Sequence, residues 1–291
     1  MHHEWHDPSR HCTACGTRAG DVVIWPADPV TERAYRVWSV GSDDRIAAAF
    51  RVEAEAFVGR RNLGPGLRVL DAACGSGNAT LPAARTGAVV TGLDLVGSSL
   101  DAASARAARE GLRVMLEQGN VELLPFPDGE FDVVLSMFGV MFAARPDRVL
   151  AELSRVTRST GQVALASWTP GAFFGELFAI HAALVPPPPD LPDPLHWGDP
   201  DVVGEWFDDR EWDVNTKVRT LRVRYPYTPG GTGELYRVAY GPTVRAFEAL
   251  DEDGRAVLAA DIAAHWARHR HSSAAGTEVE AEFLELVAIR R

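Results

Sequence analysis

A glycine-rich turn follows a short apolar segment in the first third of the chain. Residues 69–78 read VLDAACGSGN, with glycine at positions 75 and 77. Glycine has no Cβ, so the backbone there can approach a ligand closely. A helix that starts just after the turn points free N–H groups at the same spot. In open parallel sheets ligands bind at this end of the strands, so the turn predicts a ligand site.

A single carboxylate closes the next apolar segment. Asp94 ends residues 91–94, which follow the turn. A carboxylate in that place can accept both hydroxyl hydrogens of a ribose. The plainer alternative is that Asp94 only caps the next helix. The two strand-end features in this order favour a nucleoside-type cofactor.

The spacing of the turn helps to choose between nucleoside cofactors. A nicotinamide dinucleotide site has the pattern G-x-G-x-x-G, and residues 75–80 lack its third glycine. Asp71 instead stands four residues before Gly75. A carboxylate there can orient water and backbone near a cationic amino-acid tail, which favours S-adenosylmethionine (SAM). A nicotinamide-dependent oxidoreductase stays open as the alternative.

Alternating strand and helix signals surround these residues and must position them. After an irregular stretch over residues 1–30, a helical pattern runs over 31–61. Strands are predicted at 68–72, 88–93, 113–117, 131–137 and 161–168, and helices at 78–86, 98–110 and 146–157. Strands that alternate with helices indicate parallel βαβ units, so we expect an α/β fold with a doubly wound, mostly parallel sheet.

The regular alternation stops after residue 168. Helices are predicted at residues 173–185, 234–250 and 255–269, and strands at 218–227 and 283–289. Four consecutive prolines at 186–189 cannot continue a helix. A helical insertion between sheet elements commonly covers a ligand site, so we expect a cap here.

The turn resembles motif I of the class I SAM-dependent methyltransferases. The family pattern D-x-G-x-G-x-G is matched at Asp71, Gly75 and Gly77. The sequence departs from it at Ala73, and Asn78 is off-pattern as well, although D-x-A-C-G-T-G-N is a common variant.

Further matches extend the resemblance over residues 63–168. Residues 118–126 resemble the G-D-A-x-x-L-P-F stretch, with Asn120 in place of the aspartate. The resemblance implies that Asn120 meets the adenine amino group and that Val121 offers its backbone N–H. Residues 131–136 resemble the fourth strand, and residues 155–161 resemble R-V-x-R-P-G-G without its proline. Residues 136–142, 167–170 and 240–243 resemble a bacterial small-molecule subgroup related to the quinone C-methyltransferases.

The resemblance implies a complete architecture and a set of cofactor contacts. It implies a Rossmann-like, seven-stranded sheet with an N-terminal helical lid and a cap inserted after the fifth strand. The expected division is an irregular extension (1–30), the lid (31–62), the SAM-binding core (63–168), and the cap with the completion of the sheet (169–291). The cofactor would be SAM, with S-adenosylhomocysteine as product. The predicted cofactor-binding residues are Trp38, Asp71, Ala72, Ala73, Gly75, Gly77, Asn78, Asp94, Leu95, Gly119, Asn120, Val121, Ser136 and Met137.

The expected chemistry is methyl transfer to a small molecule in specialised, natural-product metabolism. SAM carries its methyl group on a sulfonium, so transfer is an in-line displacement and alignment alone can contribute roughly 7–11 kcal/mol. A general base is optional; the candidates for one are His181, His196 and Tyr240. Two alternatives stay open: a non-methylating cyclase or eliminase of the same fold, and a non-catalytic SAM-binding module.

Aromatic residues that follow strand ends or lie in the cap are candidates for the acceptor pocket, together with one methionine. They would suit a flat or apolar acceptor, and plain core packing is the competing interpretation. The candidates are Phe138, Met141, Phe142, Trp168, Phe173, Phe174, Trp197 and Tyr240.

The N-terminal pair Cys12 and Cys15 has the spacing of half a zinc site. Histidines at positions 2, 3, 6 and 11 are potential further ligands, but no second C-x-x-C exists in the sequence. The sequence therefore favours no metal site, with these two cysteines as weak zinc candidates.

Charge and hydropathy limit the partners. The formal net charge of −11 disfavours nucleic acids and anionic membrane surfaces. No apolar run approaches the roughly 20 residues of a membrane span, and the N-terminus lacks signal-peptide features. We therefore expect a cytoplasmic protein, and related enzymes suggest a homodimer.

Overall fold

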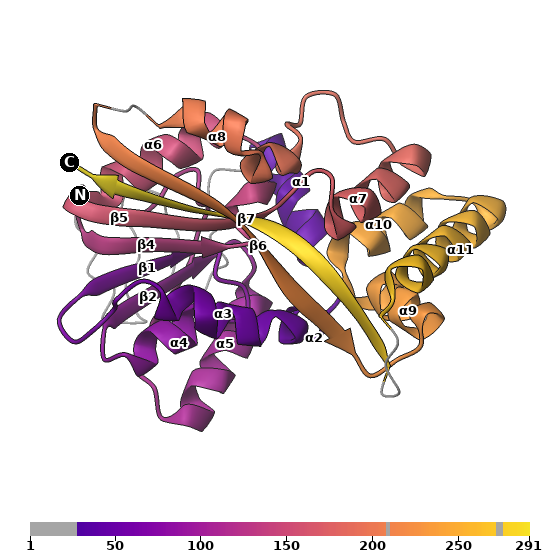
Figure 1. Cartoon of the computed structure of the whole chain (residues 1–291), viewed down its shortest axis with the longest axis horizontal. Coiled ribbons are helices and arrows are strands. Elements are labelled where there is room, and N and C mark those ends of the chain that lie inside the picture. The colour runs from indigo at the N-terminus through magenta and orange to yellow at the C-terminus, as the bar shows by residue number, and fades with distance from the viewer. Residues whose placement is uncertain (1–27, 208–209, 272–275) are drawn as a thin grey trace.

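A seven-stranded sheet forms the centre of the computed structural model, which describes residues 28–207, 210–271 and 276–291. Its strand order is β3-β2-β1-β4-β5-β7-β6 (Figure 1). Strands β1 to β5 run parallel, and β7 is antiparallel to both β5 and β6. The strands are β1 (Arg68–Ala72), β2 (Val89–Asp94), β3 (Met115–Gln118), β4 (Phe131–Met137), β5 (Thr157–Trp168), β6 (Trp212–Tyr225) and β7 (Thr277–Arg290). This confirms the predicted α/β, mostly parallel, seven-stranded sheet.

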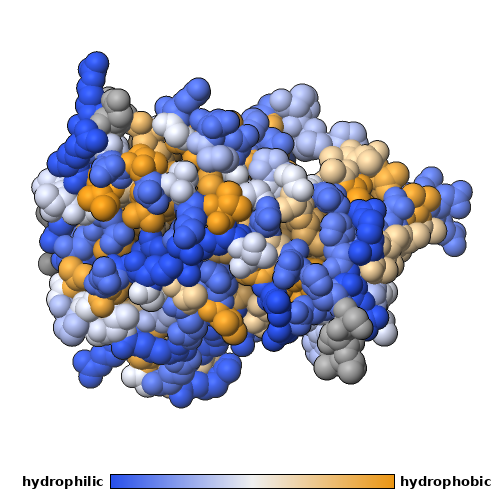
Figure 2. All heavy atoms as spheres, in the orientation of Figure 1, coloured by the Kyte–Doolittle hydropathy of each residue, from blue (hydrophilic) through white to orange (hydrophobic). Residues whose placement is uncertain are grey.

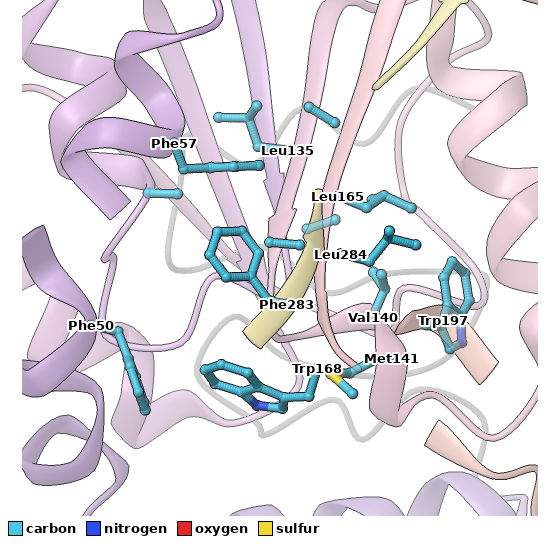
Figure 3. Close-up of a cluster of buried hydrophobic side chains, with 14 of the residues drawn as sticks. Phe50, Phe57, Leu135, Val140, Met141, Leu165, Trp168, Trp197, Phe283 and Leu284 are labelled. Atoms are coloured by element: carbon cyan, nitrogen blue, oxygen red, sulfur yellow. The ribbon is translucent and has the colours of Figure 1, made fainter. Parts of the chain in front are cut away.

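Helices cover both sides of the parallel strands. The helices here are α3 (Arg51–Gly59), α4 (Thr80–Arg85), α5 (Gly97–Glu110) and α6 (Pro146–Val156). In Figure 1, α3, α4 and α5 gather at one side of the strands and α6 lies toward the other. Strands covered on both faces are apolar almost throughout, which explains why β4 has the unbroken run Val133, Val134, Leu135. Leu135 and Leu165 belong to this core, with Phe57 nearby (Figure 3).

The N-terminal helical segment is broken into short helices. They are α1 (Pro29–Trp38), α2 (Asp43–Ala47) and the 3₁₀ turn η1 (Ala48–Phe50), followed by α3. Asp28 caps α1, since its Oδ1 accepts hydrogen bonds from the N–H groups of Val30 and Thr31. The chain turns at Gly41, which has a φ of 84°, a conformation that favours glycine. The predicted continuous pattern over residues 31–61 therefore misses this turn.

The predicted cap exists, but in two parts. Its first part, between β5 and β6, comprises α7 (Phe173–Leu184), η3 (Pro194–Gly198) and α8 (Pro200–Trp206). Its second part, between β6 and β7, comprises α9 (Pro229–Ala239), α10 (Gly241–Ala249) and α11 (Glu252–His269). Figure 1 shows α7, α9, α10 and α11 together beside the far ends of β6 and β7. Strand β6, predicted at residues 218–227, returns to the sheet between the two parts.

The surface of the face in Figure 2 is mixed in character. Hydrophobic residues are scattered there among hydrophilic ones rather than gathered in one continuous patch. Among the described residues, no helix combines the length and apolar character that crossing a membrane requires.

Candidate functional site

A cavity of about 230 Å³ lies at the carboxyl ends of β1, β2 and β4. Helices α1 and α2 close it from the N-terminal side, through Thr31, Trp38 and Ala47 among others. Ten of the predicted cofactor residues line it: Trp38, Ala73, Gly75, Asn78, Asp94, Leu95, Gly119, Asn120, Val121 and Met137. The structure therefore brings together most of the residues that the sequence placed at one site.

The glycine-rich turn forms the floor of the cavity. Gly75 has a φ of 53°, and a Cβ there would meet nothing within 4 Å, so its Cα faces open space. Gly77 has a φ of 83°, and a Cβ there would lie 2.7 Å from the Leu81 side chain. Gly75 thus leaves room for a ligand, whereas Gly77 serves the packing of α4 beneath the turn.

Asp94 connects the turn to the start of α5. Its Oδ2 accepts a hydrogen bond from the Gly75 N–H at 2.8 Å, and its Oδ1 accepts one from the Val96 N–H at 2.9 Å. A carboxylate has about four acceptor positions, so each oxygen keeps capacity for a ligand hydroxyl. Burial raises the pKa of this carboxyl. Asp94 therefore both organises the backbone and faces the cavity.

Four predicted cofactor residues do not line the cavity but support it from below. Asp71 is buried, accepts a 2.6 Å hydrogen bond from the Thr80 hydroxyl, and has a pKa raised by burial to about 7. The Ser136 hydroxyl donates to the carbonyl oxygen of Ala72 at 2.7 Å. The four residues outside the lining are Asp71, Ala72, Gly77 and Ser136. A residue can match a sequence motif because it shapes the turn, with no ligand contact of its own.

Asn120 links the far wall of the cavity to helix α1. Its side-chain amide donates to the Thr31 hydroxyl at 3.0 Å, and its Oδ1 accepts the N–H of Glu122 at 2.9 Å. An amide oxygen has a second lone pair, so Oδ1 can still accept from a ligand amino group. The sequence did not reveal Thr31 as part of this site.

Arg145 fastens α1 over the cavity. Its guanidinium donates to Asp28 Oδ1 and to Glu122 Oε2, each at 2.6 Å. Glu122 also accepts the backbone N–H groups of Ala144 and Arg145. The hydrogen bond from Arg145 lowers the pKa of Asp28 well below its usual range. Sequence analysis missed this network because its members are far apart in the chain and follow no motif.

The acceptor candidates divide into cavity and core residues. Phe138, Phe142, Trp168 and Tyr240 line the cavity. The Trp38 ring lies 4.7 Å from the Phe142 ring and 5.8 Å from the Tyr240 ring, between centroids. The Phe138 ring stacks on Trp168 at 3.6 Å with 6° between the planes.

The remaining acceptor candidates are buried in the core and do not line the cavity. They are Met141, Phe173, Phe174 and Trp197, each exposed by 4% or less. Figure 3 shows Met141 and Trp197 among the packed side chains near Trp168. For these four residues the structure supports packing, because other core side chains surround them.

Neither histidine proposed as a base lines the cavity. His181 contacts the Leu177 carbonyl oxygen through Nδ1 at 2.7 Å and the Thr243 hydroxyl through Nε2 at 2.9 Å, and burial lowers its pKa. His196 is exposed in η3. Tyr240 is the one base candidate that lines the cavity. Cys12 and Cys15, the weak zinc candidates, lie outside the described residues.

Comparison with known proteins identifies a matching family and proteins of similar sequence. A family profile described as a methyltransferase domain matches residues 70–165. An uncharacterized protein of Mycobacterium tuberculosis (strain ATCC 25618 / H37Rv) is 39% identical over 206 residues, 70% of this chain and 74% of that protein. The demethylmenaquinone methyltransferase of Deinococcus radiodurans is 33% identical over 150 residues, 50% of this chain and 59% of that enzyme.

Solved structures share the fold. The YcgJ protein of Bacillus subtilis superposes with a TM-score of 0.54 at 16% identity, over 82% of this chain and 98% of that one. The [4+2]-cyclase SpnF superposes with a TM-score of 0.53 at 19% identity, over 83% and 81% of the two chains. At such identities the likeness concerns the fold alone.

Proposed function

The chain belongs to the class I SAM-dependent methyltransferases, and we propose that it transfers the methyl group of SAM to a small, flat or apolar acceptor in specialised metabolism. One observation carries this proposal. The turn, Asp94 and Asn120 border the same cavity as the aromatic residues Phe142 and Tyr240. A cofactor held by the first group would therefore lie next to an acceptor held by the second.

The cavity residues fit an adenosyl ligand. Both oxygens of Asp94 keep acceptor capacity after their backbone hydrogen bonds, as a ribose with two hydroxyls requires. Gly75 leaves space where any other residue would carry a Cβ. Asn120 and Val121 border the opposite wall. When bound, SAM would supply an electrophilic methyl group.

The cavity residues support catalysis by positioning the cofactor and the acceptor rather than by a general base. Among the described residues that line the cavity there is no histidine. Burial raises the pKa of the Cys74 thiol well above its usual value, which disfavours a thiolate. Glu122 is engaged by Arg145 and two backbone N–H groups. We therefore propose an acceptor that is nucleophilic or acidic enough to react once aligned, with Tyr240 the remaining base candidate.

The cofactor part of the proposal is tested by calorimetry with S-adenosylhomocysteine. Asp94→Asn removes the charge that two ribose hydroxyls would meet. Asparagine keeps one acceptor oxygen, so about one hydrogen bond to a charged group is lost, which contributes about 1.5–3 kcal/mol. We therefore expect a loss in affinity of about 10- to 100-fold. Asp132→Asn is the matched control, since Asp132 also accepts a backbone N–H, from Arg68 at 2.8 Å, but does not line the cavity. Equal affinities in the wild type and in folded Asp94→Asn protein would contradict the proposal.

The transfer itself is tested with labelled SAM and a panel of flat, apolar phenols, amines and acidic carbon acids. We expect a labelled product and an equal amount of S-adenosylhomocysteine. Formation of product without S-adenosylhomocysteine would instead support a non-methylating reaction. The fold shared with a cyclase does not decide between the two reactions. Binding without turnover on any acceptor would favour a non-catalytic module.

The partner predictions remain part of the proposal. We propose that the protein acts in the cytoplasm, without nucleic acid or membrane partners, and as a homodimer. The net charge of −11 supports the exclusion of both kinds of partner. Sedimentation of the full-length protein tests the dimer.

A further inference from the structure

Two cap helices bring together three side chains that typically bind metal ions. Glu176 lies on α7, and His265 and His269 lie one turn apart on α11. Their ligand atoms all lie within 4.8 Å of one another. Two histidines at positions i and i+4 share one face of a helix, which is a known arrangement for metal ligands. We propose that Glu176, His265 and His269 form a binding site for a divalent transition-metal ion of the zinc type.

The distances are close to those of a bound ion. Glu176 Oε2 lies 2.9 Å from His269 Nε2 and 3.6 Å from His265 Nδ1. Zinc bonds of about 2.0–2.1 Å in tetrahedral geometry put neighbouring ligand atoms about 3.3 Å apart. These two separations lie on either side of this value, and the third, between the two histidine nitrogens, is within 4.8 Å. Rotation of the partly exposed Glu176 and His269 side chains can adjust the three atoms around one ion.

His265 already has the protonation state that a ligand needs. Its Nε2 lies 3.0 Å from the Phe173 carbonyl oxygen, which can only accept, so a proton is on Nε2. In the neutral ring the lone pair is then on Nδ1. Metal-bound histidines commonly have their other nitrogen held in this way by a backbone carbonyl. The imidazole is fully buried, so this hydrogen bond is shielded from water.

A positive group already occupies the position that the ion would take. The Arg268 guanidinium lies 3.0 Å from Glu176 Oε2 and 3.2 Å from His265 Nδ1. A guanidinium has only donors, so this contact independently assigns the lone pair to Nδ1. The Arg268 side chain is 63% exposed, so it can move into water at little cost. The competing interpretation is that Arg268 alone fills the site, and the experiment must separate the two.

An ion here would connect the two parts of the cap next to the cavity wall. Figure 1 shows α7 and α11 close together, and the Phe173 ring lies 4.3 Å from the His265 ring. Phe173 contacts Phe174, which packs against the cavity residue Trp168 at 4.1 Å. Two imidazole nitrogens and one carboxylate suit Zn²⁺ and leave a fourth position for water. The inference does not depend on the proposed methyl transfer.

The test uses the full-length protein with Cys12→Ser and Cys15→Ser, which removes the other zinc candidates of the chain. After treatment with a chelator, the protein is titrated with Zn²⁺ by calorimetry and its Tm is measured with and without the ion. We expect one equivalent bound and a higher Tm, because a ligand that binds only the folded state stabilises it. Co²⁺ should give a visible spectrum of nitrogen and oxygen ligation without thiolate bands.

Variants identify the ligands. Glu176→Gln and His269→Gln should each weaken Zn²⁺ binding by about tenfold or more, since even indirect partners of metal ligands have effects of this size. His271→Gln is the control, because His271 is an exposed histidine on the same stretch of chain and outside the cluster. Arg268→Ala should strengthen binding by removing the competing cation.

Three outcomes would overturn the inference. The first is the absence of Zn²⁺ binding by the protein that carries both cysteine substitutions. The second is wild-type affinity in Glu176→Gln and His269→Gln. The third is weaker Zn²⁺ binding in Arg268→Ala, which would show that Arg268 is a structural partner of Glu176 and His265 rather than a substitute for an ion.

Discussion

At the residue scale, Ala73 is the point where the chain departs from the glycine of its family pattern. Its φ of 57° lies in the left-handed region. A non-glycine residue in that region costs about 1–2 kcal/mol. The turn therefore holds Ala73 in a conformation that glycine adopts without strain. Gly139 packs tightly against this residue, since a Cβ on Gly139 would lie 2.6 Å from both the Cβ and the carbonyl oxygen of Ala73.

The first prediction follows from that strain. Ala73→Gly should leave the free energy of unfolding unchanged or raise it by up to about 1 kcal/mol, because relief of the strain exceeds the added chain entropy. Ala72→Gly is the control because Ala72 is fully buried in β1. Glycine in a strand should cost about 1 kcal/mol or more. Denaturant unfolding measures both, and equal destabilisation by the two substitutions would refute the strain argument.

The second prediction concerns Asp71 and pH. Burial raises the pKa of this carboxyl from 3.8 to about 7, so the folded state holds a proton that the unfolded state releases above about pH 4. The Asp71 contribution to wild-type stability should therefore fall as pH rises from about 4 to about 7, with no further change above. Asp71→Asn cannot ionise, so its stability relative to wild type should rise over this window by up to roughly 4 kcal/mol.

Unfolding at pH 5 and pH 8 checks this, because the difference between the two proteins must grow with pH. Parallel curves would mean that Asp71 is ionised in the folded protein across the whole range. The Thr80 hydroxyl, which donates to Asp71 at 2.6 Å, keeps a carbonyl acceptor in the asparagine variant.

At the element scale, one buried carboxylate joins β7, β6 and the end of α3. Glu285 of β7 is 4% exposed and pairs with Arg61 at 2.8 Å, with Arg219 of β6 at 3.0 Å, and with Arg60. Three cations share one anion, so loss of the anion would leave buried positive charge uncompensated.

The third prediction is that Glu285→Gln lowers the free energy of unfolding by about 3–5 kcal/mol. Glu282→Gln is the matched control, because this side chain lies on the same strand and is exposed. Its effect should stay within about 0.5 kcal/mol. Thermal and denaturant unfolding measure both variants. If the two substitutions had similar effects, the cluster would not stabilise the junction of these elements.

The elements that the sequence predicted well are those whose apolar pattern follows from local burial. Strands β1, β2 and β4 are buried on both faces, and their apolar runs marked their positions closely. Strand β7 extends beyond the predicted residues 283–289 at both ends. Strand β6 begins at Trp212, before the predicted residues 218–227, and ends at Tyr225, inside that range. The pairing of the two strands continues where one face is exposed. The expected helix over 234–250 is divided at Tyr240, whose backbone is extended with φ −92° and ψ 113°. A new helix, α10, begins at Gly241 with Pro242 in its first turn, where the missing proline N–H breaks no helical hydrogen bond.

Part of the candidate site could likewise not be predicted from local sequence patterns. The glycine-rich turn and Asp94 carry their signal in a few consecutive residues, so they were predictable. The contacts that close the cavity join Asp28 to Arg145 and Asn120 to Thr31, 117 and 89 positions apart. Such pairs depend on tertiary structure, and a single sequence holds no periodicity that marks them.

At the scale of the whole molecule, the N-terminal lid and the cap meet directly beside the cavity. The Ser42 N–H donates to the Ala239 carbonyl oxygen at 3.0 Å. A Cβ on Gly41 would lie 2.4 Å from the Ala239 carbonyl oxygen, and one on Gly241 would lie 2.3 Å from that of Val37. The backbones of segments that are far apart in the sequence therefore come into close contact at two glycines.

The last prediction uses that approach. Gly241→Ala would force α10 and α1 apart, which should lower the free energy of unfolding by about 1–3 kcal/mol, as overpacking does. Trp38 follows Val37 and lines the cavity, so the same shift should weaken S-adenosylhomocysteine binding. Gly230→Ala is the control, because a Cβ on Gly230 meets nothing within 4 Å and a helix tolerates alanine. Calorimetry and unfolding separate the outcomes: weaker binding in Gly241→Ala alone would mean that cofactor affinity depends on lid and cap together, whereas unchanged binding in a destabilised variant would show that the glycine contact serves only the fold.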